Sequence, residues 1–210
     1  MNNNFSEEML SALREKVKYE MGEKRYNHTL EVEKMALCLG EIYAPSDIPM
    51  LRAAALLHDV TKERSTEEHI AICESFGIRV TEAEKSAPKM FHARTAALII
   101  PQKYPEFASD ELISAVRYHT TGRADMTIHE KIIYLADYID MSRKFEDCVS
   151  LRNYFFDFDF ENADEEQKME QLRKTLIKSY DITIKGLLED GKMIDPCTFE
   201  ARNFLIIEQI

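Results

Sequence analysis

The sequence predicts an all-α protein, and two observations point to that class. Apolar residues recur at intervals of three and four along most of the chain, whereas the alternating pattern of a half-buried strand is absent. The six glycines and six prolines lie mostly between these periodic segments, where they would separate one helix from the next. With 45% hydrophobic and 31% charged residues in a chain of 210, we expect a globular helical protein with one large core.

The N-terminal half is predicted to contain five helices, each bounded by a cap or a helix breaker. Ser6, followed by two glutamates, is typical of an N-cap, and Pro49 suits the first turn of the third helix. Gly77 suits the position after the fourth helix, and Pro101 is expected to close the fifth. A short helical turn at 81–84 separates these last two. The five predicted helices cover residues 7–20, 23–43, 48–58, 66–76 and 92–100.

The C-terminal half is predicted to contain three helices and one connector. Ser109 caps the first helix and Gly122 ends it. The stretch 140–162 is expected to be irregular, because its six aromatic residues are mixed with acidic ones, which indicates a packed connector. We predict one domain over 1–190 and a C-terminal extension over 191–210, whose apolar end docks on the domain or on a partner. The three predicted helices cover residues 110–121, 129–139 and 163–189.

Charge and hydropathy exclude two classes of partner. The net charge of −11, without a basic run, argues against extended DNA or RNA, because such ligands require a positive surface. No run approaches the roughly 20 apolar residues of a membrane span. The segment Met1–Glu8 has neither the basic start nor the apolar core of a signal peptide, so we expect a cytoplasmic protein. A small phosphorylated ligand remains compatible with this composition.

A His-Asp pair at the end of an apolar run is the most informative short motif. His58 and Asp59 follow the run Ala53–Leu57, and Lys62 comes three residues later. An imidazole beside a carboxylate supplies nitrogen and oxygen donors for a transition metal, and the lysine could reach an anionic ligand. Taken alone, however, such a dipeptide is most often just a helix C-terminus that ends in polar residues.

Further ionisable residues extend apolar helical stripes elsewhere in the chain. They are His28, His58, His119 and Asp137, and Asp59 adjoins one of them. A single histidine on an apolar face is usually a core residue, but an unpaired buried carboxylate costs several kcal/mol. One bound cation shared by these helices would satisfy all of the groups. We therefore predict that the helices surround a single centre.

These residues resemble a known family. The order of His28, His58-Asp59 and Asp137 is similar to the H…HD…D signature of the HD-domain metal-dependent phosphohydrolases. Within that superfamily the chain resembles the YqeK-type branch, the bacterial symmetrical bis(5′-nucleosyl)-tetraphosphatases, over about residues 10–188. Alanines follow His92 where the branch tends to have glycines, and Met141 stands where proline is usual. The matching segments are Arg25–His28, Ala54–Lys62, His92, Tyr118–Gly122, Lys131–Ile139 and Arg143.

The resemblance implies a helical HD-domain bundle around a buried metal site, and a homodimer. It implies cleavage of diadenosine tetraphosphate, a small-molecule nucleotide, into two ADP, with iron as the expected metal. A second metal could lie near His92 and His119, either of which, if protonated, could assist the leaving ADP. The implied metal ligands are His28, His58, Asp59 and Asp137. The implied catalytic residues are Asp59, Lys62, His92 and His119. The implied substrate contacts are Arg25, Lys62, His92, His119, Thr120 and Arg143.

Two other functions remain open at this point. A different HD phosphohydrolase would act on a nucleotide mono-, di- or triphosphate or on a cyclic phosphodiester. A non-catalytic nucleotide-binding module would be expected to have lost some of the ligand residues, which this chain retains. A metal-dependent oxygenase on a related scaffold would need further ligands. His69 and His129 are candidates by residue type, but both lie in acidic contexts typical of the surface.

Overall fold

The computed structural model describes residues 5–85 and 87–208, and within these residues the chain is helical and contains no strand. The all-α prediction is therefore confirmed. The α-helices are α1 (Glu7–Lys18), α2 (Glu23–Tyr43), α3 (Ile48–Leu57), α4 (Thr66–Ser75), α5 (Glu82–Lys85), α6 (Phe91–Lys103), α7 (Asp110–Tyr118), α8 (Ile128–Ile139), α9 (Glu146–Phe156), α10 (Glu165–Glu189) and α11 (Pro196–Ile207). No described helix combines the length and the hydrophobicity that a membrane span requires.

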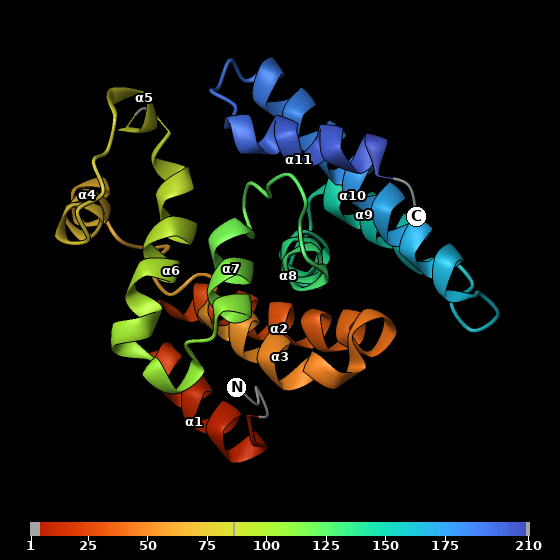
Figure 1. Ribbon diagram of the computed structural model, residues 1–210, viewed down its shortest axis with the longest axis horizontal. Coiled ribbons are helices and arrows are strands. Elements are labelled where there is room, and N and C mark those ends of the chain that lie inside the picture. Colours follow the sequence, from red (N-terminus) through yellow and green to blue (C-terminus); the bar gives the residue numbers. More distant parts are fainter. Residues whose placement is uncertain (1–4, 86, 209–210) are drawn as a thin grey trace.

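Helix α8 lies at the centre of the molecule (Figure 1), where it packs against α2, α3 and α7 on one side and against α9 and α10 on the other. Helix α3 is the most apolar neighbour, because its residues from Met50 to Leu57 are all buried except Arg52. Helix α6 packs on α7, and the short helices α4 and α5 lie beyond it. The ends of α3, α7 and α8 therefore lie close together near the middle of the fold.

The aromatic stretch 140–162 corrects one prediction, because its middle part, Glu146–Phe156, forms α9 rather than an irregular connector. Leu151, Arg152 and Phe155 form the buried face of this helix, at the spacing expected of an amphipathic helix. The charged and aromatic residues between them obscured this period in the sequence. The expectation that the stretch is packed holds, since the ring of Phe155 contacts those of Phe156 and Phe160.

Two predicted helix ends also differ from the structure. Pro101 does not close α6, which continues to Lys103, because a proline in the last turn removes only one hydrogen bond. Helix α7 ends at Tyr118, four residues before the predicted glycine. Gly122 has a φ of 64°, and a Cβ there would lie 1.8 Å from the hydroxyl oxygen of Tyr180. The glycine is therefore needed both for its backbone conformation and for the close approach of α10.

Helix α11 near the C-terminus packs on the body of the protein. Helix α11 lies along α10, and Ala201 and Leu205 belong to the main hydrophobic core. The Arg173 Nη1 of α10 donates a hydrogen bond to the carbonyl oxygen of Leu205 at 2.7 Å. The boundary between a domain over 1–190 and an extension over 191–210 stays a prediction.

A buried carboxylate joins the first three helices and leads to a stability prediction. Glu33, only 5% exposed, accepts hydrogen bonds from Arg14 Nη2 at 2.6 Å and from Arg52 Nε at 2.9 Å. We expect Glu33→Ala to lower the free energy of unfolding by about 3 kcal/mol, because two partly buried guanidinium groups lose their buried counterion and keep only the exposed Glu7. Urea unfolding measures the change. The control Glu31→Ala removes only the contact with the exposed Lys34 and should cost less than about 0.5 kcal/mol. Equal losses in the two variants would contradict the role of Glu33.

Candidate metal centre

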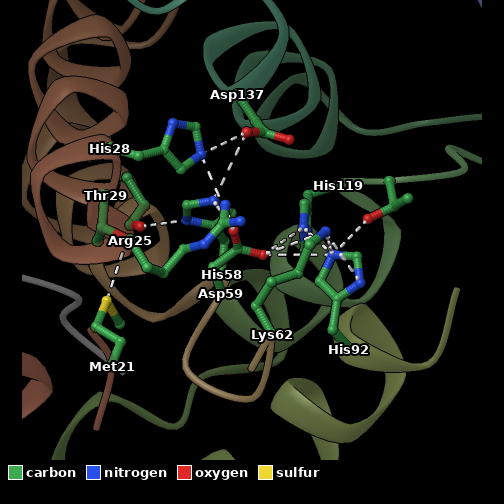
Figure 2. Close-up of polar contacts among 12 residues, drawn as sticks. Met21, Arg25, His28, Thr29, His58, Asp59, Lys62, His92, His119 and Asp137 are labelled. Carbon is green, nitrogen blue, oxygen red and sulfur yellow. Dashed lines mark hydrogen bonds and ion pairs between the residues drawn. The ribbon is translucent and has the colours of Figure 1, made fainter. Parts of the chain in front are cut away.

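The predicted ligands come from helix ends that meet at one point (Figure 2). His28 lies in the second turn of α2, His58 follows the last residue of α3, and Asp137 lies in the last turn of α8. Asp59 directly follows His58 in the turn after α3, and His119 follows the last residue of α7. All five side chains are buried except that of Asp137, which is partly exposed. The four helices are thus brought together as the sequence predicts.

Two neighbouring groups of donor atoms make up this centre. In the first group, His28 Nε2 lies 3.0 Å from Asp137 Oδ1, and His58 Nε2 lies 3.8 Å from the same oxygen. A second carboxylate oxygen, Asp59 Oδ2, lies 3.4 Å from His58 Nε2 and 3.9 Å from His28 Nε2. His28, His58 and Asp137 have the spacing of residues that could hold a metal ion.

The second group lies on the opposite side of the same aspartate. Asp59 Oδ1 lies 3.3 Å from His92 Nε2 and 3.7 Å from His119 Nε2. Figure 2 shows the Asp59 carboxylate between this pair of histidines and the pair formed by His28 and Asp137. His58, Asp59 and His119 form a second set with metal-ligand spacing. Asp59 therefore belongs to both groups, one carboxylate oxygen facing each.

Backbone carbonyls fix the histidine tautomers in the ligating form. The Nδ1 atoms of His58, His92 and His119 lie 2.6–2.7 Å from the carbonyl oxygens of Ala55, Lys89 and Val116, each three residues earlier. A carbonyl only accepts, so Nδ1 must carry the hydrogen, and the Nε2 of the neutral ring keeps its lone pair. Three histidines thus direct Nε2 lone pairs at the centre, which is the arrangement that ligation by imidazole needs.

This packing of acceptors fits a bound cation. His92 Nε2 and His119 Nε2 lie 3.1 Å apart although neither carries a hydrogen in these tautomers. Within the described residues, the buried His28 Nε2, His58 Nε2 and Asp59 Oδ1 atoms have no hydrogen-bond partner. Unsatisfied buried acceptors are costly, and several of them converging on one point fit a bound metal ion. Imidazole nitrogens together with carboxylate oxygens suit a transition metal such as iron or zinc.

The carboxylates of the centre are held in their ionised form. Burial would raise the pKa of Asp59, but its close contacts with the rings of His58, His119 and His92 outweigh burial and hold the pKa well below its usual value. Burial opposes ionisation of Asp137 too, and Arg143 and His28 lower its pKa. The pKa of His28 is raised to about 9 against the effect of burial, because the carboxylates of Asp137 and Asp140 lie 3.0 and 3.4 Å from its two ring nitrogens. Metal binding at His28 would therefore release a proton.

Four cationic or hydroxyl side chains predicted to contact substrate surround the centre. Lys62 Nζ lies 2.9 Å from His92 Nε2, to which Thr120 Oγ1 can donate a second hydrogen bond at 3.0 Å. Arg25 Nη1 donates to Asp59 Oδ2 at 2.7 Å. Arg143 pairs with the other metal-site carboxylate, its Nη2 lying 2.5 Å from the oxygen of Asp137 that faces His28. The structure thus brings every predicted site residue to one centre, while their catalytic and binding roles stay predictions.

Asp140 and Ser142 belong to the centre but were not predicted. Asp140 is fully buried, its Oδ2 lies 3.4 Å from His28 Nδ1, and its Oδ1 accepts hydrogen bonds from the backbone N–H and hydroxyl of Ser142. The Ser142 hydroxyl in turn lies 3.0 Å from His28 Nδ1. An aspartate one helical turn after Asp137 was the available signal. Because carboxylates that bind the far nitrogen of a ligand histidine orient it, Asp140 acts as a positioning residue for His28.

We expect Asp140→Asn to weaken metal affinity by about 10- to 100-fold, because the amide orients the His28 ring less firmly than the carboxylate. Titration of the metal-free protein with Fe²⁺ or Mn²⁺ measures the affinity. Turnover should return at saturating metal, since no direct ligand is removed. An unchanged metal affinity would show that His28 is positioned without Asp140.

His69 differs from its predicted surface location. It is buried, its Nδ1 lies 2.8 Å from Thr95 Oγ1, and its ring stacks on that of Phe91. Thr61 Oγ1 donates to the carbonyl oxygen of His92 at 2.8 Å. These contacts join the turn after α3 to α6 and hold His92 in place. His129 contacts Asp47 Oδ2 at 3.0 Å.

Comparisons with known proteins agree with this geometry. A model of the HD domain family matches residues 25–142. Two proteins named bis(5′-nucleosyl)-tetraphosphatase, symmetrical, are similar to the chain: that of Bacillus subtilis is 31% identical over 90% of this chain and 94% of its own length, and that of Halalkalibacterium halodurans 30% identical over 92% and 95%. A crystal structure from Clostridium acetobutylicum, described as an HD superfamily hydrolase involved in NAD metabolism, has a TM-score of 0.80 and 31% identity. It covers 93% of this chain and 96% of its own.

Proposed function

The chain belongs to the HD domain family, and from this membership we propose that it is a metal-dependent phosphohydrolase that splits diadenosine tetraphosphate symmetrically into two ADP molecules. The observation that carries the proposal is the similarity, over nine tenths of the chain, to two proteins named as symmetrical tetraphosphatases. The centre supports it, because its ligand atoms could hold a metal ion and its lysine and arginines carry positive charge. Hydrolysis of a phosphoanhydride needs positive charge close to its oxygens.

We propose that His28, His58, Asp59 and Asp137 hold the metal and that it is iron. Asp59, His92 and His119 would hold a second metal, and the proximity of Asp59 Oδ1 to the Nε2 atoms of both histidines supports this proposal. When bound, such metals supply Lewis-acid chemistry: they lower the pKa of coordinated water and neutralise phosphoryl charge. Since burial lowers the pKa of both His92 and His119, these rings are better suited to ligation than to proton donation.

The other residues of the centre bind and orient the polyphosphate. Lys62 places its ammonium group beside His92, where it meets charge that develops on a phosphoryl or leaving oxygen. Arg25 and Arg143 stand on the opposite side, each held in place by a metal-site carboxylate. Thr120 offers a hydroxyl beside His92. Cations on both sides of the carboxylates suit a substrate whose negative charge extends in two directions from the bond that breaks.

Product analysis tests the proposed activity. The purified protein is analysed for bound metal and then incubated with diadenosine tetraphosphate, and the products are separated by ion-exchange chromatography. We expect two ADP for each substrate consumed. A mixture of ATP and AMP would contradict symmetrical cleavage, and inorganic phosphate or nucleosides from mononucleotides would favour a different HD phosphohydrolase.

We also propose that the protein is a homodimer that works in the cytoplasm, as the family resemblance implies. Ile206 and Ile207 near the end of α11 are at least half exposed and provide apolar surface for a second copy. Light scattering of the full chain measures the assembly, and Ile206→Asp should shift it towards the monomer if this surface is used. Cell fractionation tests the location.

A further inference from the structure

A cleft opens beside His28 on the side of the centre away from His92 and His119. Its volume is about 290 Å³, which lies at the lower end of the roughly 300–1,000 Å³ of small-molecule pockets. It is therefore large enough for part of a dinucleotide rather than for the whole molecule. Besides His28, its lining residues are Lys24, Arg25, Glu63, Ser142, Arg143 and Phe145.

The charge of this cleft favours phosphate. Arg25 and Arg143 reach it from the metal-site carboxylates, and Lys24 is exposed at its edge and makes no ion pair in the part of the chain that the structure describes. The single carboxylate of the lining, that of Glu63, is engaged by the backbone N–H of Gly22 at 2.6 Å and braces the wall. A polyphosphate that leaves the metal centre on this side therefore meets three cations.

Phe145 is the unusual residue of the lining. It occupies the N-cap position of α9, where polar side chains that bond to the helix are preferred, and it makes no capping hydrogen bond. Its side chain is also 72% exposed, so it contributes little to the core. Neither helix capping nor packing accounts for a phenylalanine here. Residues that contradict local preference in this way tend to serve function.

We propose that Phe145 stacks on a nucleobase of the substrate, and that the cleft holds one adenosine arm of the tetraphosphate. This inference depends on the proposed function and specifies which residue recognises the base. Symmetrical cleavage places equal ADP halves on either side of the bond that breaks, so each half must extend away from the centre. One half passes Arg25 and Arg143 with its phosphates and reaches the ring of Phe145 with its base. Every base has a π-face, so stacking tolerates guanine as well as adenine.

Binding of ADP and of pyrophosphate to the metal-loaded protein separates base recognition from phosphate recognition. We expect Phe145→Leu to weaken ADP binding by on the order of ten-fold and to leave pyrophosphate binding unchanged, because only ADP carries a base. Phe145→Tyr should retain the affinity for ADP. With diadenosine tetraphosphate the leucine variant should raise KM and leave kcat nearly unchanged.

The matched control is Phe156→Leu, the same substitution at the other end of α9, which should change neither affinity. The inference is overturned if Phe145→Leu keeps the ADP affinity within two-fold, if it weakens pyrophosphate equally, or if the wild-type protein does not bind ADP. Failure of the wild-type protein to produce two ADP would instead refute the proposed function, while the ADP measurements would still report on Phe145.

Discussion

Replacing Asp137 by alanine is expected to abolish metal binding and turnover together. The Oδ1 atom of this residue is the oxygen nearest to His28 Nε2, at 3.0 Å, and it also faces His58. Without it the first donor group keeps the imidazoles of His28 and His58 but loses the one carboxylate that it does not share with the second group. We expect bound metal to fall below a tenth of the wild-type content and kcat to fall by roughly a thousand-fold or more, equivalent to about 4 kcal/mol. Elemental analysis and steady-state kinetics on the same preparation measure both.

Two further variants show whether this loss is specific. Asp137→Asn keeps the size of the side chain and should lose metal as well, because an amide oxygen carries no charge to offset that of the cation. The exposed Asp157 lies at the end of α9, and Asp157→Ala should leave metal content and turnover unchanged. Normal turnover by a metal-free Asp137→Ala protein would refute the assignment of this residue as a ligand.

Most of the fold could be predicted from local patterns because its helices are amphipathic and carry ordinary caps. Two helices are exceptions: α11, which lies in the stretch predicted only as an extension, and α9, which lies in the predicted irregular connector. Helix α9 shows the reason. Its buried face consists of Leu151 and Phe155 with an arginine between them, and Arg152 is buried because it donates hydrogen bonds to the carbonyl oxygens of Ile139 and Asp140. A charged residue on a buried face is explained only by tertiary partners, which periodicity does not reveal.

The centre was predictable for a related reason. Histidines and a carboxylate that extend apolar stripes must meet a common partner, so their residue types and register imply a shared site. The sequence does not reveal how they are oriented. The i to i−3 contacts that direct the Nε2 atoms inward depend on helix-end geometry, and the division of the two Asp59 oxygens between the donor groups depends on three-dimensional placement. Asp140 was missed because it positions His28 and does not extend an apolar stripe, which was the pattern used to find the other site residues.

Replacing Lys62 by alanine is expected to lower kcat by about 100- to 1,000-fold while the metal content stays intact. Lys62 Nζ lies 2.9 Å from His92 Nε2 and 3.9 Å from Asp59 Oδ1, which are both atoms of the second donor group. Its ammonium group has no lone pair, so it cannot itself ligate a metal. Burial lowers its pKa, and the two metal-site carboxylates partly offset that effect. A poorly solvated ammonium group interacts strongly with charge that appears on a nearby phosphoryl oxygen.

Metal content decides how a Lys62→Ala result is interpreted. If kcat falls with metal retained, the ammonium group acts on the polyphosphate, and KM should change less than kcat because the charge it meets is greatest in the transition state. If metal is lost together with turnover, Lys62 instead holds His92 in its ligating position, and its separate catalytic role is contradicted. Lys34→Ala, which removes an exposed lysine of α2 that contacts only Glu31 among the described residues, is the control and should leave both quantities unchanged. The Lys62→Ala variant therefore shows whether this centre only binds a metal or whether the lysine also stabilises the reacting phosphate.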